Sequence, residues 1–313
     1  MSQIPQQIIN GIQLGSIYAL IALGYTMVYG VLRLINFAHG DVFMVGAFLG
    51  YYAAVYLKLQ EQPTLGAALI ALLPVLLVTM IACALLGFLI ERLAYRPLRR
   101  APRLTALITA IGVSLFLVNG AQLLFKADPK FFPSVTPQGA ASTLNAGGLV
   151  ISKDQLVLVV AAALLMAVLW YIVQRTRIGK AMRAVSHDAD AAALMGINTD
   201  TVISFTFALG AALAGAGGML FAALSYAKIL PVMGTTMGLK AFVAAVVGGI
   251  GSIPGAMLGG LLMGLAESFV KGASRIGNFE PSRWTDAVAF VLLILVLLVR
   301  PAGLLGKFAP EKV

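Results

Sequence analysis

Apolar runs long enough to cross a lipid bilayer recur along the whole chain, and they restrict the fold more than any other feature. The hydrocarbon core of a bilayer is about 30 Å thick, so a spanning helix needs about 20 mostly apolar residues. Of the 313 residues, 60% are hydrophobic and 11% are charged, whereas about a quarter of the residues in a soluble domain are charged. The alternating strands of a closed barrel are absent from the sequence. We therefore predict an all-α polytopic membrane protein.

Apolar runs between charged residues predict about eight or nine transmembrane spans. These runs cover residues 8–30, 41–57, 66–90, 104–125, 155–174, 201–224, 237–249, 254–270 and 285–299. The pair near 237–270 is short and is broken at "IGSIPG". Irregular backbone at membrane depth persists only where protein or water satisfies its amides. We therefore expect the break to be a turn packed inside the protein.

Basic residues gather in two of the predicted loops and indicate the orientation of the chain. Residues 91–103 hold Arg92, Arg96, Arg99, Arg100 and Arg103, and residues 175–200 hold Arg175, Arg177, Lys180 and Arg183. Short loops this basic face the cytoplasm under the positive-inside rule. Counting spans from these loops places the N-terminus and residues 126–154 outside. The basic residues Arg300, Lys307 and Lys312 place the C-terminal tail in the cytoplasm, so the stretch 225–284 should contain an even number of crossings or a re-entrant pair.

The net charge of +10 is interpreted as this topology signal, and we expect no nucleic-acid partner. The N-terminal segment "MSQIPQQIING" has no basic stretch, and no small-residue cleavage site follows the first apolar run. We therefore expect the first run to be retained as a span and not removed as a signal peptide.

The side chains required for catalysis or metal binding are missing from the sequence. Cys83 is the single cysteine, and His39 and His187 are the only histidines. There is no Gly-Lys-Ser/Thr phosphate-binding loop and no nucleophile with a neighbouring base. We therefore predict a protein that is not an enzyme, with no catalytic residues, no cofactor and no metal.

Ionisable residues inside the predicted spans are scarce. Lys240 and Glu267 lie near predicted span ends, and we interpret them as side chains that reach out to the membrane surface. Proton- or ion-coupled carriers carry facing charged residues through the bilayer. Their scarcity here argues against an ion-coupled secondary carrier or channel.

The polar segment at residues 175–200 predicts one or two short helices on the cytoplasmic face. One stripe with three- and four-residue spacing consists of Ile178, Met182, Val185, Ala189, Ala192 and Gly196. This periodicity is helical, so the stripe should face the bundle, while Arg183, His187 and Asp190 should face water. Gly196 is a natural left-handed stop, after which Asn198, Thr199 and Asp200 can cap the next span.

The small side chains of this stripe favour docking into a groove of a partner protein. A helix that anchors on a membrane surface would carry bulky apolar residues instead. The alternative is a folded loop that packs only on its own bundle.

A second polar stretch, "LINFAHGDVF", also has two interpretations. In the first, Asn36 and His39 satisfy free backbone groups, Gly40 breaks the helix and Asp41 caps the next span. In the second, the break opens toward a central pathway, and these four residues touch the cargo.

Several stretches resemble the permeases of ATP-binding-cassette importers. "DAAALMG", residues 190–196, resembles the Glu-Ala-Ala-x-x-x-Gly coupling loop that fits a cleft on the cytoplasmic ATPase. Here Asp190 stands in place of glutamate, and the Ile-x-Leu-Pro that follows in that motif is missing. Four longer stretches, "INFAHGDVFMVGAF", "IGKAMRAVSHDADAAALMGIN", "AFVAAVVGGIGSIPGAMLGG" and "LLVRPAGLLG", are similar to the LivH/LivM family of branched-chain amino acid permeases, which is related to ribose-type permeases.

This resemblance runs over nearly the whole chain and is weakest at residues 126–154. It implies one permease domain, residues 1–313, in the cell inner membrane, which imports leucine, isoleucine or valine. The implied partners are a second, LivM-like permease, two cytoplasmic ATPases and a periplasmic amino-acid-binding protein, besides the lipid bilayer. The implied coupling residues are Gly179, Arg183, Asp190, Ala191, Ala192 and Gly196. The same architecture with urea, amides or other amino acids as cargo is the nearest alternative.

Overall fold

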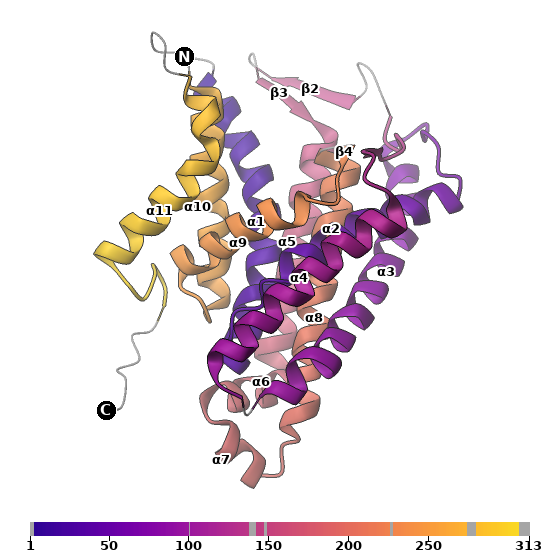
Figure 1. Ribbon diagram of the computed structural model, residues 1–313. Helices are drawn as coiled ribbons and strands as arrows, with labels where there is room; N and C mark the ends of the chain where they lie inside the picture. Colours follow the sequence, from indigo (N-terminus) through magenta and orange to yellow (C-terminus); the bar gives the residue numbers. More distant parts are fainter. Residues whose placement is uncertain are drawn as a thin grey trace.

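The computed structural model describes residues 3–99, 101–137, 142–146, 149–225, 228–273 and 280–306 (Figure 1). Its helices are α1 (Gln3–Leu32), α2 (His39–Tyr56), α3 (Leu65–Ile90), α4 (Arg103–Phe125), α5 (Lys153–Arg175), α6 (Arg177–His187), α7 (Ala189–Leu194), α8 (Thr199–Leu220), α9 (Met233–Gly248), α10 (Ile253–Gly272) and α11 (Thr285–Val299). Short strands β1 (Lys130–Phe131), β2 (Thr143–Ala146), β3 (Leu149–Ser152) and β4 (Lys228–Ile229) form two antiparallel pairs, β1 with β4 and β2 with β3. Arg100, Lys307 and Lys312 lie outside the described residues.

Each predicted apolar run coincides with a helix, which confirms the prediction of an all-α polytopic membrane protein. Within the described part of the chain, seven helices are long and apolar enough to cross a membrane. The two remaining predicted spans form the shorter helices α2, with 18 residues, and α9, with 16. The number of spans therefore depends on how α2 and α9 are counted.

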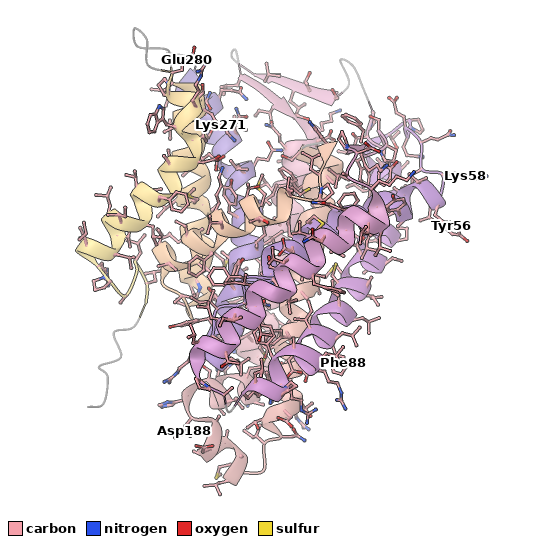
Figure 2. The ribbon with its side chains drawn as sticks, viewed as in Figure 1. Tyr56, Lys58, Phe88, Asp188, Lys271 and Glu280 are labelled. Atoms are coloured by element: carbon pink, nitrogen blue, oxygen red, sulfur yellow. The ribbon has the colours of Figure 1, made fainter. Side chains whose placement is uncertain are left out.

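Two helices form the centre of the bundle. In the most apolar stretch of α1, 78% of residues are buried, and in α8 the share is 83%, against 22% in α3, 17% in α4 and 11% in α11. The last three helices therefore form the periphery and present leucine, isoleucine and phenylalanine side chains outward (Figure 2).

Glycines let the central helices approach one another closely. A Cβ atom on Gly15 of α1 would lie 2.8 Å from the Cα of Leu261 on α10, and one on Gly264 would lie 2.2 Å from the backbone nitrogen of Gly15. Gly46 of α2 meets Gly215 of α8 in the same way, at 2.4 Å. Small residues at helix interfaces replace the hydrophobic driving force that is absent in lipid. In this bundle they pack helices of one chain together.

The chain places its connecting segments at two opposite ends of the bundle (Figures 1 and 2). At one end, the Gln6 side chain bonds to the backbone of Val150 on β3 in both directions, and the Ser268 hydroxyl donates to the Gln7 carbonyl at 2.7 Å. Lys271 and Glu280 lie there too, whereas Asp188 marks the other end, with α6 and α7. The relative order of the loops is therefore the one that span counting predicts. Which end faces the cytoplasm stays a prediction.

The turn between α9 and α10 confirms the predicted packing of "GGIGSIPG" only in part. Gly248, Gly249 and Gly255 are buried, whereas Gly251 and Pro254 are exposed. Gly249 and Gly251 have φ angles of +109° and +93°, in the left-handed region where a side chain is strained. The amides of Leu304 and Leu305 donate to the carbonyls of Val247 and Gly248 at 2.9 and 2.8 Å. The segment that follows α11 thus satisfies the end of α9.

Candidate coupling site

Three side-chain caps set the path of the chain through residues 175–200. The Thr176 hydroxyl accepts from the amide of Gly179 at 3.1 Å and begins α6. Asp188 Oδ1 accepts from the amides of the second and third residues of α7 at 3.0 and 2.9 Å. The Asn198 side chain accepts from the Thr201 amide at 3.0 Å and begins α8, as predicted. Each cap satisfies amides that a helix start leaves free.

The apolar stripe predicted for this segment is present in α6 and only partly in α7. Met182, Val185 and Ala192 are 4%, 3% and 4% exposed, so these positions face the bundle as expected. Ala189 and Gly196 are exposed, and the prediction is wrong there. The stripe assumed one continuous helix, but extended backbone at Asp188 separates α6 from α7 and changes their common face.

Two of the predicted coupling residues hold α6 against α5. A Cβ atom at Gly179 would lie 2.2 Å from the carbonyl oxygen of Ile172, so only glycine permits this approach. Arg183 is an exposed residue, and its guanidinium donates to the carbonyl of Val173 near the end of α5. That carbonyl belongs to the last turn of a helix, where a cation also complements the helix dipole.

The remaining predicted residues lie at the tip of the molecule (Figure 1). Asp190 and Ala191 are exposed on α7, and Gly196 has a φ angle of +81°, which confirms the left-handed stop. Beside them, Leu194 is 89% exposed and Met195 is 83% exposed. Sequence reasoning missed these two residues because they fall off the small-residue stripe. Two large apolar residues directly before a glycine, in a polar segment, were the available signal.

A charged cluster ties the start of α8 to the end of α3. Asp200 pairs with both Arg96 and Arg99, and Arg99 also pairs with Glu91. The hydroxyl of Ser204 donates to Glu91 Oε2 at 2.5 Å. The basic segment after α3 and the polar segment before α8 are thus joined at one end of the bundle. A displacement of one segment would therefore displace the other.

The polar stretch at the start of α2 lies in the core and differs in detail from the first interpretation. Asp41 is 1% exposed and does not cap α2, because the cap residue is Ala38 and no side chain bonds there. Gly40 does not break the helix either, since the break covers residues 33–38 and Gly40 lies in the first turn of α2. Its role is close contact, because an added Cβ would lie 2.5 Å from the Gly234 carbonyl oxygen on α9.

Asn36 and His39 are likewise buried, at 4% and 2% exposed. The Tyr95 hydroxyl donates to the Asn36 side-chain oxygen at 2.9 Å, and the ring centroids of His39 and Tyr25 are 4.9 Å apart, edge to face. All four predicted pathway residues therefore gather at the start of α2, against α1, α9 and the segment after α3.

The positions of Lys240 and Glu267 contradict the prediction that these side chains reach out to the membrane surface. Glu267 is 1% exposed, and its Oε1 lies 3.0 Å from the Lys240 ammonium and 2.8 Å from that of Lys271. Its Oε2 accepts from the Tyr18 hydroxyl at 2.6 Å, and Lys240 also pairs with Asp286 at 2.7 Å. The cluster joins α1, α9, α10 and α11. In the described part of the chain, no three His, Cys, Asp or Glu residues gather as a metal site would require.

Comparison with known proteins identifies the family. The model of the family described as "Branched-chain amino acid transport system / permease component" matches residues 7–297. The chain belongs to this permease family. The sequence-based assignment is therefore confirmed, as is the interpretation as a transport subunit and not an enzyme.

Several members and relatives of this permease family are similar to the chain. The high-affinity branched-chain amino acid transport system permease protein BraD of Pseudomonas aeruginosa is 45% identical, over 98% of this chain and 97% of BraD. The corresponding permease LivH of Escherichia coli K12 is 43% identical, with the same coverage. The ribose import permease RbsC of Haemophilus influenzae is 31% identical over 43% of this chain and 42% of RbsC.

Proposed function

We propose that this permease is the membrane-spanning subunit of an ATP-binding-cassette importer that carries leucine, isoleucine and valine across the cell inner membrane. The single observation that carries the cargo assignment is the identity of 45% and 43%, over nearly full length, to permeases named for high-affinity branched-chain amino acid transport. Residues 1–313 act as one permease domain. Its N-terminus lies outside, and its C-terminus lies in the cytoplasm.

The coupling region is residues 175–200, and α7 is the part that binds a cytoplasmic ATPase. The exposed Leu194 and Met195 support this role, because two large apolar side chains at a polar tip suit a partner's cleft. Asp190 and Ala191 line the same tip, and Gly196 turns the chain back toward α8. Gly179, Arg183 and Ala192 act indirectly, since they hold α6 and α7 on the bundle.

Closure of the ATPases would therefore move α6 and α7 together with the segments joined to them. The pairs of Asp200 with Arg96 and Arg99 link the start of α8 to the end of α3. We expect this link to carry the displacement into the bundle, which then alternates between outward-open and inward-open forms.

The start of α2 is our candidate for one wall of the cargo pathway. Gly40 and the Asp41 carboxylate lie against Gly234 of α9, the short helix. The His39 imidazole lies against Gly24 of α1, and the Asn36 amide oxygen accepts from Tyr95. A displacement of α9 would uncover groups able to contact a zwitterionic amino acid transiently. A binding protein outside the membrane would supply the selectivity, so weak contacts suffice.

The proposed complex contains a second, homologous permease, two ATPases and a periplasmic amino-acid-binding protein. The test is reconstitution of this complex in vesicles, with labelled leucine and binding protein outside. We expect uptake that requires ATP after ion gradients are collapsed, and competition by isoleucine and valine. Uptake driven by an ion gradient without ATP would contradict the importer. Competition by urea, amides or polar amino acids alone would identify a different cargo for the same machine.

The coupling role has its own test. Leu194→Glu and Gly196→Val should reduce co-purification of the ATPase by about tenfold, because the loss of one apolar anchor weakens an interface by roughly that factor. Membrane insertion of both variants should be unchanged. Leu144→Glu is the matched control, because Leu144 is 48% exposed at the opposite end of the bundle. Undiminished ATPase binding by both coupling variants would refute the docking role and leave the cargo assignment intact.

A further inference from the structure

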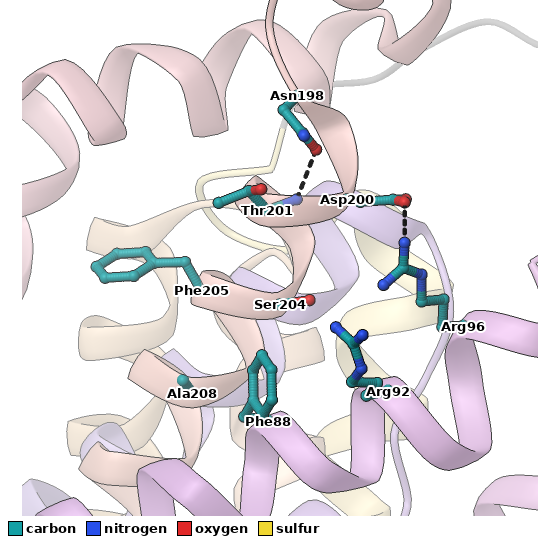
Figure 3. Close-up of a pocket in the computed structure, with 9 residues that line it drawn as sticks. All are labelled: Phe88, Arg92, Arg96, Asn198, Asp200, Thr201, Ser204, Phe205 and Ala208. Carbon is teal, nitrogen blue, oxygen red and sulfur yellow. Dashed lines mark hydrogen bonds and ion pairs between the residues drawn. The ribbon is translucent and has the colours of Figure 1, made fainter.

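A pocket of about 390 Å³ opens on the flank of the bundle, between the end of α3 and the start of α8 (Figure 3). Its walls combine the phenyl rings of Phe88 and Phe205 with the guanidinium groups of Arg92 and Arg96 and the hydroxyl of Thr201. Apolar and cationic surface thus lie side by side in one concave site.

The geometry of two helices creates this pocket. At Gly87 the helices α3 and α8 touch, because an added Cβ there would lie 2.4 Å from the Cβ of Ala211. Directly after this contact, α3 passes into a π-helical turn, Glu91–Tyr95, which includes Arg92. Such turns widen the helix and are frequent at functional sites. The contact closes one end of the pocket, and the turn presents Arg92 at the other.

The charges around the pocket do not cancel. Arg92, Arg96 and Arg99 supply three positive charges, and Glu91 and Asp200 supply two negative ones. Both carboxylates are engaged by Arg96 and Arg99. Among the described residues, the Arg92 guanidinium has no carboxylate partner and lies 6.0 Å from the centroid of the Phe88 ring. The site is therefore an unsatisfied cation beside an apolar wall.

The pocket lies where the apolar surface of α3 gives way to charge. Leu85 and Leu89, in the turns before the pocket, are 59% and 48% exposed on a membrane-spanning helix. Basic pockets between membrane helices are suited to anionic lipid head groups. The tip of α7, where a soluble protein would dock, lies at the same end of the bundle as this pocket (Figure 1).

We propose that this pocket binds an anionic phospholipid. Arg92 and Arg96, with the Thr201 hydroxyl, bind the phosphate, and an acyl chain lies along Phe88 and Phe205. The lipid would sit directly on the charged cluster that joins α3 to α8. Its occupancy would therefore stiffen the connection between these two helices.

The test is native mass spectrometry of the purified full-length permease with phosphatidylglycerol or phosphatidylcholine of the same acyl chains. We expect preferential retention of phosphatidylglycerol. Because one basic residue near the head groups contributes about 1 kcal/mol, Arg92→Gln should lower this retention about fivefold. Arg92→Lys should retain most of it. Lys180→Gln is the matched control, since Lys180 is exposed on α6 and lies outside the pocket.

A second variant removes space instead of charge. Ala208→Leu fills the pocket from α8 and should also lower phosphatidylglycerol retention, with no change in net charge. Absence of any preference in the unmodified permease, or equal loss in Lys180→Gln, would overturn the proposal. Displacement of the lipid by excess inorganic phosphate would show a site for the anion alone. Displacement by the ATPase would show a protein interface, and either result would overturn the lipid assignment.

Discussion

At the scale of single residues, the closest helix contacts of the bundle depend on the absence of a side chain. Gly264 of α10 lies so near α1 that an added Cβ would be 2.2 Å from the backbone nitrogen of Gly15. Backbone atoms cannot move aside as the end of a flexible side chain can. The tolerance for substitution therefore differs sharply between glycines that the sequence alone presents as equivalent.

We predict that Gly264→Leu destabilises the permease by about 3 kcal/mol, the upper range for an overpacked core. Gly112→Leu is the control, because Gly112 of α4 is exposed and an added Cβ there meets nothing within 4 Å. The measurement is thermal unfolding in detergent with a thiol-reactive dye. Cys83 is the single cysteine and is buried, so it reacts when the bundle opens. Equal unfolding midpoints for the two variants would contradict the assigned contact.

Glu267 is a second residue whose buried environment determines how costly its substitution is. It accepts from Tyr18 and pairs with Lys240 and Lys271, so several groups depend on one negative charge. Removing one partner of a buried ion pair is far more costly than removing an exposed charge, because the remaining charge stays buried.

We therefore predict that Glu267→Gln lowers stability by about 3 kcal/mol, at the low end of the range for broken buried pairs. The low end applies because Asp286 still contacts Lys240. Asp286→Asn should have a much smaller effect, since that side chain is 79% exposed. The same Cys83 unfolding assay measures both variants. A larger loss in Asp286→Asn than in Glu267→Gln would refute the assigned hierarchy.

At the scale of elements, α7 is the shortest α-helix in the described part of the chain and is too short to persist by itself. It has six residues, whereas isolated helices shorter than about 12 residues are marginal in water. Its order therefore depends on the Asp188 cap, on the burial of Ala192 and on the left-handed turn at Gly196. The proposed docking surface rests on a few local interactions.

Removal of the cap should loosen α7 selectively. Asp188→Ala deletes the acceptor of two amide hydrogen bonds, and a lost cap costs about 1 kcal/mol. We expect amide hydrogen exchange at residues 189–195 to accelerate about fivefold, as 1 kcal/mol implies. Asp190→Ala, which removes an exposed acid next to the cap, should leave exchange nearly unchanged. Equal exchange in both variants would show that packing alone orders α7.

The helices were predictable from the sequence because each apolar run is long and is bounded by charges or glycines. The tertiary contacts of individual side chains were not predictable in the same way. Lys240 and Glu267 are 27 residues apart and meet only because α9 and α10 pack together with the register that their glycines permit. The buried start of α2 and the exposed Leu194 and Met195 also depend on which surfaces other helices cover. Periodicity reports a local face, and tertiary packing decides whether that face is buried.

At the scale of the whole molecule, the two ends of the bundle differ in chemistry. One end carries the paired strands β1 to β4 and the start of α1. The other carries α6, α7 and the arginines that follow α3 (Figure 1). Both the coupling region and the lipid pocket belong to this second end. Their roles require that it face the cytoplasm, so the orientation of the chain is the most consequential prediction.

Single cysteines at the two ends test this orientation. Lys180 and Asp128 are exposed at opposite ends, and Cys83 is buried and should not react in the folded protein. A membrane-impermeant thiol reagent added to intact cells with a permeable outer layer should label Asp128→Cys and not Lys180→Cys. Permeabilising the inner membrane should expose both to the reagent. Because clustered basic residues resist translocation, Lys180→Cys should stay protected until then. Labelling of Lys180→Cys from outside would invert the orientation and place α7 beyond the reach of any cytoplasmic ATPase.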